Sequence, residues 1–346
     1  MFKRFIKSYH YILVLLCVQT QGIAQYSDQS ILDSSYYFTF HNNYWINLHH
    51  FLYQKAGGSQ LSKLQRDGNE MLIIGEKEVE ESLTSQQRTV LDGAISYYKD
   101  NLIQKGLLRD LGLERFWLQK QSGYIAIADS TVSKEFVDVL NKSSKIYQKT
   151  YWSIHKKHNK DVLDFQISNI QKLEKRIIPR MEKVALTPWP FEKKVRVDLT
   201  TYANYAGAYT PTRPIFNVLV STIDPKSRTP DFLETIFHEG SHLLFRYGGT
   251  WRESIFKTFE AGNYTMSFPR HLWHVSLFYL CGQICIEEFT NVGIKGYRMT
   301  MFSRNIFTSY HSPDLFAMLD EYITNRATLN ETTKKMLRIL ESKSQM

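Results

Sequence analysis

The chain has 346 residues, of which 43% are hydrophobic and 22% are charged, and it carries a formal net charge of +9. This length suits one large domain or two closely packed ones, with ample apolar material for a core. Three cysteines exclude a fold that depends on disulfides, and no run after the N-terminus is long and apolar enough to cross a membrane.

The N-terminus has the features of a cleavable secretory signal. Basic residues come first, the apolar run from Tyr11 to Val18 is too short for a stable anchor, and Gly22-Ile23-Ala24 supplies small residues for a signal peptidase. An uncleaved membrane anchor is the less favoured alternative, because polar residues 19–21 end the apolar run. Residues 1–24 are therefore expected to be a signal peptide, and the mature protein to be periplasmic or secreted.

Export and net charge together indicate which kinds of binding partner to expect. Lys3, Arg4 and Lys7 account for three of the positive charges, which leaves the mature chain at +6. An exported protein is separated from nucleic acid, so we expect no nucleic-acid partner. The remaining positive excess suits an anionic cell surface or simple solubility.

Residues 25–186 are predicted to form a helical region with a few breaks. Apolar residues repeat with helical spacing from Phe40 to Lys55, and again along the stretch from Lys134 to Val184. Thr84, with Gln87 three residues later, resembles a capping box that opens another helix.

A second region, residues 187–346, begins at a Pro-rich turn. Apolar and polar residues alternate from Val195 to Leu199, which predicts a half-exposed strand, and Ile215–Ile223 is a second strand candidate. A helix should follow, with Thr229 as its N-cap and Gly248-Gly249 at its end.

Later helices are predicted from caps and apolar spacing: one opened by Pro269, a shorter one at Ser312, and a last one capped by Asn330. Cys281 and Cys285 lie four residues apart in an apolar segment, which indicates two buried thiols and no bridge. The expected fold class is α+β, predominantly α-helical, with the two regions packed as one compact unit and a zincin-like site on a central helix preceded by a small β-sheet.

That central helix carries the sequence His-Glu-Gly-Ser-His at residues 238–242, which matches the His-Glu-x-x-His motif of zincins. Residues four apart lie one turn apart on the same helix face, so His238 and His242 can occupy two adjacent corners of a zinc tetrahedron. Glu239 lies beside them, where it can act as a base toward water. Without a metal, these buried polar groups would need other partners. The predicted cofactor is therefore Zn²⁺.

A catalytic zinc site usually has three protein ligands, so one more is required. Phe245 and Gly248 stand where the extended metzincin pattern needs Gly and His, which excludes that branch. His274, in an apolar helix, is the favoured third ligand. Glu260, at a spacing that some gluzincins use, and His271 are the alternatives.

Further blocks of sequence accompany the motif: Phe40-His41, Asn47–Tyr53, Tyr205-Ala206-Gly207-Ala208-Tyr209-Thr210, residues 237–242, and residues 272–274 with 277–279. Together they resemble a group of exported bacterial zincin-like proteins. The resemblance implies a zincin-like metallopeptidase, with no activity beyond that of the metal motif. It also favours His274 over Glu260 as the third metal ligand. Gln283 departs from the Glu expected in that group.

Three further histidines lie near the N-terminus of the mature chain, at His41, His49 and His50. On a helix, only one of the adjacent pair can face a given site. We expect His49 and His50 to belong to an aromatic-rich core helix, and contact with substrate in a cleft is the alternative. The sequence assigns no role to His41.

Two functions of different classes follow. The first is a zinc-dependent hydrolase, specifically a metallopeptidase acting on peptide or protein substrates, in which zinc acidifies water and Glu239 takes its proton. Tyr279, or else His271 or Tyr209, would assist at the oxyanion, and the strand at Ile215–Ile223 would pair with substrate. The alternative is a non-catalytic binding protein for envelope peptide or glycan, with a structural metal or none.

Overall fold

The computed structural model describes residues 30–57, 73, 75–190, 194–203, 207–246 and 248–345. The predicted signal peptide, residues 1–24, lies outside these ranges, and so do Tyr205 and Ala206 of the sequence blocks. None of the described helices is long and apolar enough to span a membrane.

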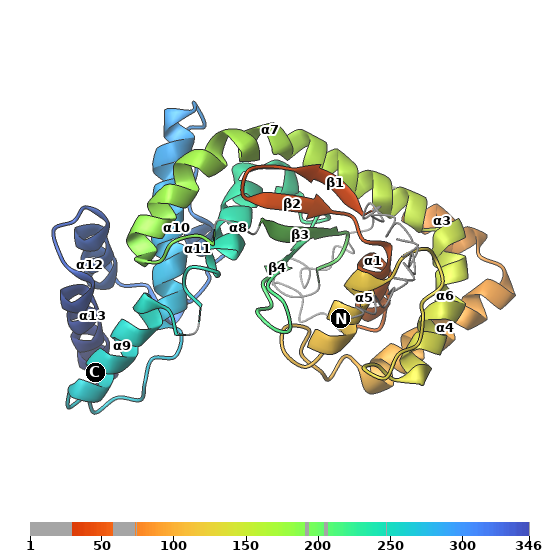
Figure 1. Ribbon diagram of the computed structural model, residues 1–346, viewed down its shortest axis with the longest axis horizontal. Helices are drawn as coiled ribbons and strands as arrows, with labels where there is room; N and C mark the ends of the chain where they lie inside the picture. Colours follow the sequence, from red (N-terminus) through yellow and green to blue (C-terminus); the bar gives the residue numbers. More distant parts are fainter. Residues whose placement is uncertain are drawn as a thin grey trace, which may run out of the picture.

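The predicted fold class is confirmed, because helices dominate and surround one small mixed sheet (Figure 1). The first half of the chain contains β1 (Ile31–Ser34), β2 (Phe38–His41), α1 (Tyr44–Lys55), α3 (Glu76–Ser82), α4 (Ser85–Asn101), α5 (Gly112–Lys120), α6 (Lys134–Lys149) and α7 (Trp152–Ala185). The second half contains β3 (Val195–Thr200), β4 (Ala208–Tyr209), β5 (Val218–Ser221), α8 (Pro230–Ser241), α9 (Thr250–Ala261), α10 (Leu272–Asn291), α11 (Thr300–Ser303), α12 (Pro313–Ile323) and α13 (Leu329–Ser344), with short 3₁₀ turns at Pro225–Arg228 and Thr308–Tyr310.

The sheet has the strand order β1-β2-β3-β5-β4. β2 runs parallel to β3, with Phe40 opposite Val197, and β3 runs parallel to β5. β4 pairs antiparallel with β5 and forms an edge of the described sheet. The strand predicted at Ile215–Ile223 is the shorter β5. Its predicted role as the substrate-pairing edge is wrong, because β3 and β4 occupy its two sides.

Each face of this sheet packs against its own hydrophobic core. Along β5, Val218 and Val220 join the core that contains residues of α7, α8 and α10, whereas Leu219 joins the core built on α1, α4, α5 and α6. α7 is 34 residues long and arches over the sheet from one group of helices to the other (Figure 1). Strands from both predicted regions share the sheet, since β2 pairs with β3 across the boundary predicted at residue 186.

Near the N-terminus, one helix is shorter than predicted. Residues Phe38–His41 form β2, where Phe38 and Phe40 point to the core with the two-residue period of a strand. α1 starts only after Asn43, whose side chain accepts a hydrogen bond from the backbone amide of Ile46 (2.9 Å). The capping box of Thr84 and Gln87 is confirmed at the start of α4.

Three other boundaries also differ. The stretch from Lys134 to Val184 is two helices, because the chain breaks between α6 and α7 at residues 150–151. α8 ends at Ser241, well before the predicted Gly248, and a series of turns follows it. α13 is capped by Thr328, through a capping box with Glu331, and not by Asn330. Cys281 and Cys285 are free and buried, as predicted.

Candidate metal centre

α8 begins where the sequence places it and carries the motif into the core. The Thr229 side chain accepts a hydrogen bond from the backbone amide of Asp231 (3.3 Å), and Pro230 occupies the first turn. His238 lies in the helix and His242 at its C-cap. The backbone of His242 keeps helical angles (φ −54°, ψ −26°), so the one-turn spacing is maintained and the two ring centroids are 5.0 Å apart.

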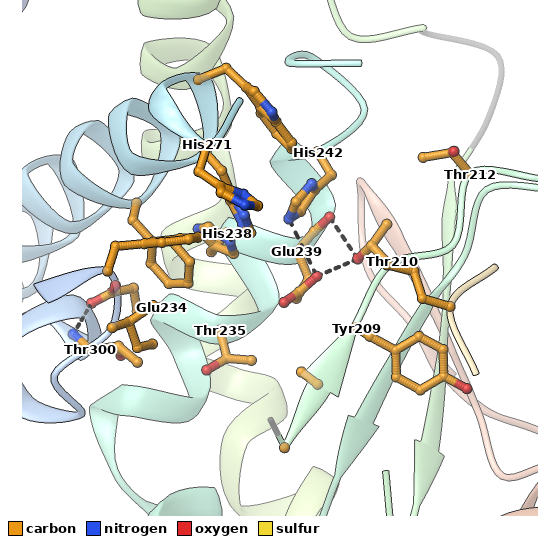
Figure 2. Close-up of a pocket in the computed structure, with 18 of the residues that line it drawn as sticks. Tyr209, Thr210, Thr212, Glu234, Thr235, His238, Glu239, His242, His271 and Thr300 are labelled. Carbon is orange, nitrogen blue, oxygen red and sulfur yellow. Dashed lines mark hydrogen bonds and ion pairs between the residues drawn. The ribbon is translucent and has the colours of Figure 1, made fainter. Parts of the chain in front are cut away.

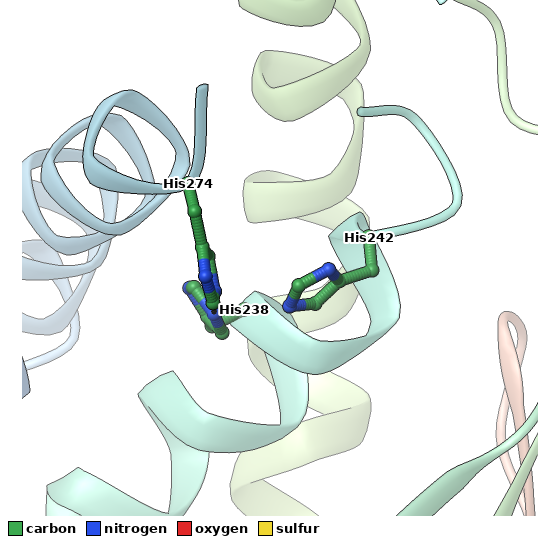
Figure 3. Close-up of side chains that lie close together, drawn as sticks. All are labelled: His238, His242 and His274. Atoms are coloured by element: carbon green, nitrogen blue, oxygen red, sulfur yellow. Dashed lines mark hydrogen bonds between the residues drawn. The ribbon is translucent and has the colours of Figure 1, made fainter. Parts of the chain in front are cut away.

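His274, in the first turn of α10, completes a cluster with the two motif histidines (Figure 3). Its Nε2 lies 3.2 Å from Nε2 of His238, and one ring nitrogen from each of the three side chains lies within 4.8 Å of the others. These nitrogens could hold a metal ion. Among the described residues, no further His, Cys, Asp or Glu joins the group.

Aromatic rings hold the imidazoles in place. Phe278 lies one turn after His274 on α10, and its ring stacks on that of His238 with centroids 3.7 Å apart. Trp273 stacks on His274 at 4.8 Å. The rings that surround the cluster leave these histidines little freedom to rotate, which favours a preformed set of ligands.

Burial keeps all three imidazoles neutral. It lowers the pKa of His238 and of His274 well below the ordinary value, with the neighbouring histidines adding to the effect. Burial and the positive charge of Arg252 lower the pKa of His242 to about 3. Neutral imidazole is the form that donates a lone pair to a metal, so the cluster is ready to bind one at neutral pH.

Glu239 lies beside the cluster and is held there by a residue of the sheet. The hydroxyl of Thr210, just after β4, donates a 2.5 Å hydrogen bond to its Oε2, which also lies 3.6 Å from Nε2 of His242. Burial raises the pKa of Glu239 to about 7, although the hydrogen bond from Thr210 acts in the lowering direction. A carboxyl that titrates near neutral pH can both accept and return a proton.

A cavity of about 1280 Å³ opens onto this arrangement. His238, Glu239, His242 and His274 all line it, together with β4, the loop after β4, α9 and the segments that flank α10 and α11. In Figure 2, Thr210 and Thr212 lie on one side of Glu239, and His271 lies on the other. The cluster is therefore accessible to a ligand of substantial size.

The structure does not bring Tyr279 or Glu260 to the cluster. The Tyr279 hydroxyl donates to Asp320 (2.9 Å), and its ring stacks on Phe316, so the expected role at the oxyanion has no geometric basis. Glu260 is exposed near the end of α9, and it does not line the cavity. His274 therefore takes the third position of the cluster, and Glu260 does not.

His271 and Tyr209 both line the cavity but play different parts. His271 is exposed, and its ring packs near Phe307 (5.6 Å), outside the three-histidine group. The hydroxyl of Tyr209 is hydrogen-bonded to Nε2 of His50 (2.9 Å), so it is directed into the core. Gln283 donates to the hydroxyl of Tyr279 and lies away from the cavity.

The three N-terminal histidines belong to the core, and none of them lines the cavity. His41 is hydrogen-bonded to Ser30 and Thr39, and His49 to the hydroxyl of Tyr98. His50 connects α1 to β4 through Tyr209. The direct contact with substrate considered for His49 and His50 is not supported by these positions.

Sequence reasoning missed three residues of the site: Thr210, Arg252 and Phe278. Thr210 belongs to one of the sequence blocks, but nothing in its neighbours points to Glu239. The guanidinium of Arg252 lies 3.4 Å above the Trp273 ring, a contact between separate helices that no local pattern encodes. Phe278 has a signal that could have found it, because it lies four residues after His274 on one helix.

Searches of protein-family models, curated proteins and solved structures returned no match to this chain. The motif and the geometry of the cluster are therefore the features that bear on function.

Proposed function

We propose that this protein is an exported zinc-dependent hydrolase, specifically a metallopeptidase of the zincin type. One observation carries the proposal: His274 converges with the two motif histidines beside the carboxylate of Glu239, on the wall of a large cavity. Histidines that only fill a core are expected to be hydrogen-bonded to other groups, so three converging ring nitrogens favour a metal site. The export element of the proposal rests on the N-terminal sequence.

The donor set fits zinc. Zinc binds imidazole nitrogens at about 2.0–2.1 Å in a tetrahedral arrangement, which places two ligand nitrogens about 3.3 Å apart. The Nε2 atoms of His238 and His274 are 3.2 Å apart. Three protein ligands leave one position open, which is typical of catalytic and not of structural zinc. When bound, zinc would supply Lewis-acid chemistry, by lowering the pKa of a water and polarising a carbonyl.

Glu239 is the residue that would hold and move the proton. With a pKa of about 7, its carboxylate can take a proton from the attacking water and deliver it to the leaving amine. Thr210 fixes the orientation of this carboxylate through its hydrogen bond to Oε2.

β4 would orient the substrate. It forms an edge of the described sheet, residues 207–210 line the cavity, and Thr210 at its end contacts Glu239. An extended peptide can add to the edge of a sheet through main-chain hydrogen bonds. A peptide paired with β4 would run past the carboxylate of Glu239, which is why we favour peptide over other hydrolase substrates.

The test compares Glu239→Gln with the parent and with Glu260→Gln, a change of the same kind at an exposed site outside the cavity. Zinc content is measured by mass spectrometry and hydrolysis with a mixture of peptides. We expect all three proteins to bind zinc equally, and Glu239→Gln alone to lose at least about 100-fold in hydrolysis. A Glu239→Gln variant that cleaves every parental substrate at the parental rate would refute the mechanism.

A further inference from the structure

Exposed arginines from three separate segments meet at the cavity. Arg109 lies between α4 and α5, Arg213 in the loop after β4, and Arg270 just before α10, and all three line the cavity. Within the described ranges of the chain, none of the three forms an ion pair. Three guanidinium groups around one cavity, without carboxylate partners, leave local positive charge for a ligand.

The acidic residues of the cavity do not offset this charge. Asp224 pairs with Arg304 (2.7 Å), and Glu253 pairs with Lys257 (2.8 Å), so each of these carboxylates already neutralises a cation of the same cavity. The other two acidic lining residues are Glu234 and Glu239. Even with both of these counted as ionised, seven Lys and Arg side chains line the cavity against four carboxylates.

Two of these arginines belong to the chain segments that also supply the site. Arg213 lies in the loop after β4, the segment whose Thr210 holds Glu239, and Arg270 lies just before α10, which carries His274. Arg252 also lines the cavity, and its guanidinium lies 3.4 Å above the ring of Trp273, the residue before His274. A ligand in the cavity therefore meets positive charge from the loop after β4 and from the segment before α10.

We propose that the cavity binds acidic peptides, whose carboxylate side chains pair with the exposed arginines that line it. This inference rests on the proposed function, because it names the substrate class of the same site. An extended peptide can pair with β4 while its side chains project into the cavity that the arginines line. Guanidinium groups bind carboxylates in a bidentate manner, and a positive cavity also attracts such peptides from a distance.

Binding to Glu239→Gln tests the inference separately from hydrolysis. The probes are two end-capped peptide libraries that are identical except that one has Glu where the other has Gln. The immobilised, zinc-loaded variant is incubated with both libraries, and retained peptides are quantified by mass spectrometry. We expect about ten-fold enrichment of the Glu library at low ionic strength, falling toward two-fold in about 0.5 M salt as the charges are screened.

The Arg109→Ala/Arg213→Ala double variant should lose most of this enrichment, whereas Arg338→Ala, at an exposed arginine of α13 outside the cavity, should keep it. The salt dependence is measured without changing any arginine, so it stands even where the double variant folds poorly. Equal retention of the two libraries, or retention of neither, overturns the acidic-peptide inference. If the Glu library is enriched but the parent protein, which retains Glu239, cleaves none of its peptides, the proposed peptidase activity is refuted.

Discussion

The hydrogen bond from Thr210 tunes the carboxyl of Glu239. The hydroxyl stabilises the ionised carboxylate and so lowers its pKa, while burial raises the pKa to about 7. In Thr210→Val the lowering contribution is lost, so the pKa of Glu239 should rise. A base must be deprotonated to act, so the acidic limb of the pH profile of kcat/KM should move to higher pH, by about one pH unit.

A matched control is Thr235→Val. Thr235 lines the same cavity, but its hydroxyl donates to the backbone carbonyl of Asp231 (2.8 Å) and makes no described contact with Glu239. In Thr235→Val the acidic limb of the pH profile of kcat/KM should stay at the parental pH. An acidic limb that stays in place or moves to lower pH in Thr210→Val would show that Thr210 does not control the base.

His274 and His271 provide a paired test of the metal ligands. Both line the cavity at the start of α10, but only His274 belongs to the three-histidine group. In His274→Ala, zinc affinity should fall by more than the roughly 10- to 100-fold that loss of a ligand's hydrogen-bonding partner costs. In His271→Ala it should stay within about three-fold of the parent.

Zinc affinity is measured by competition with a chromophoric chelator. Parental affinity in His274→Ala would exclude it as the third ligand. A large loss of zinc affinity in His271→Ala would instead show that His271 is one of the metal ligands.

At the level of single residues, the spacing of the motif predicted two members of the cluster and the carboxylate, since four residues make about one helical turn. The same rule shows why Tyr279 was a poor choice. It lies five residues after His274, which turns it about 140° away around the helix, whereas Phe278 at four residues returns to the same face. Thr210 could not be found in this way, because its contact with Glu239 joins separate elements.

Single elements were predictable where local patterns are strong. The cap at Thr229 and the capping box at Thr84 fixed the starts of α8 and α4, because these patterns are local in sequence. β4 has only two residues, too few for any alternation to be visible. The second half of β2, Phe40-His41, was assigned to a helix because it runs directly into the apolar pattern of α1.

The helix that carries the motif packs unusually closely on the sheet at Gly240. A Cβ atom there would lie 2.8 Å from Cε1 and 3.1 Å from Cζ of Phe38, a ring that is fully buried in β2. Gly240→Ala should therefore displace α8 and lower the free energy of unfolding by about 1–3 kcal/mol, even though alanine is the better helix former. Urea denaturation measures this change.

Gly93, in α4, is the matched control, because a Cβ atom there would meet nothing within 4 Å. Gly93→Ala should raise the free energy of unfolding by about 0.5–1 kcal/mol. If Gly240→Ala were equally stabilising, the close contact between α8 and β2 would not exist.

For the whole molecule, the sequence predicted the class of fold but not the order of the strands. β2 and β3 are adjacent in the sheet, yet α1 through α7 lie between them in the chain. Apolar periodicity shows which face of an element is buried but carries no information about its partner. The sharing of one sheet by both predicted regions could therefore be learned only from the structure.

The sheet and its two cores also predict how the protein responds to loss of metal. The histidine cluster joins only α8 and α10, whereas buried apolar residues from helices on both faces of the sheet hold the fold together. Chelation should therefore leave the far-UV circular dichroism unchanged at 25 °C. Zinc at about 100 times its Kd should raise the free energy of unfolding by about 2.7 kcal/mol, and His274→Ala should lose this gain. If chelation unfolds the parent, the metal is structural, and the non-catalytic binding protein becomes the better account.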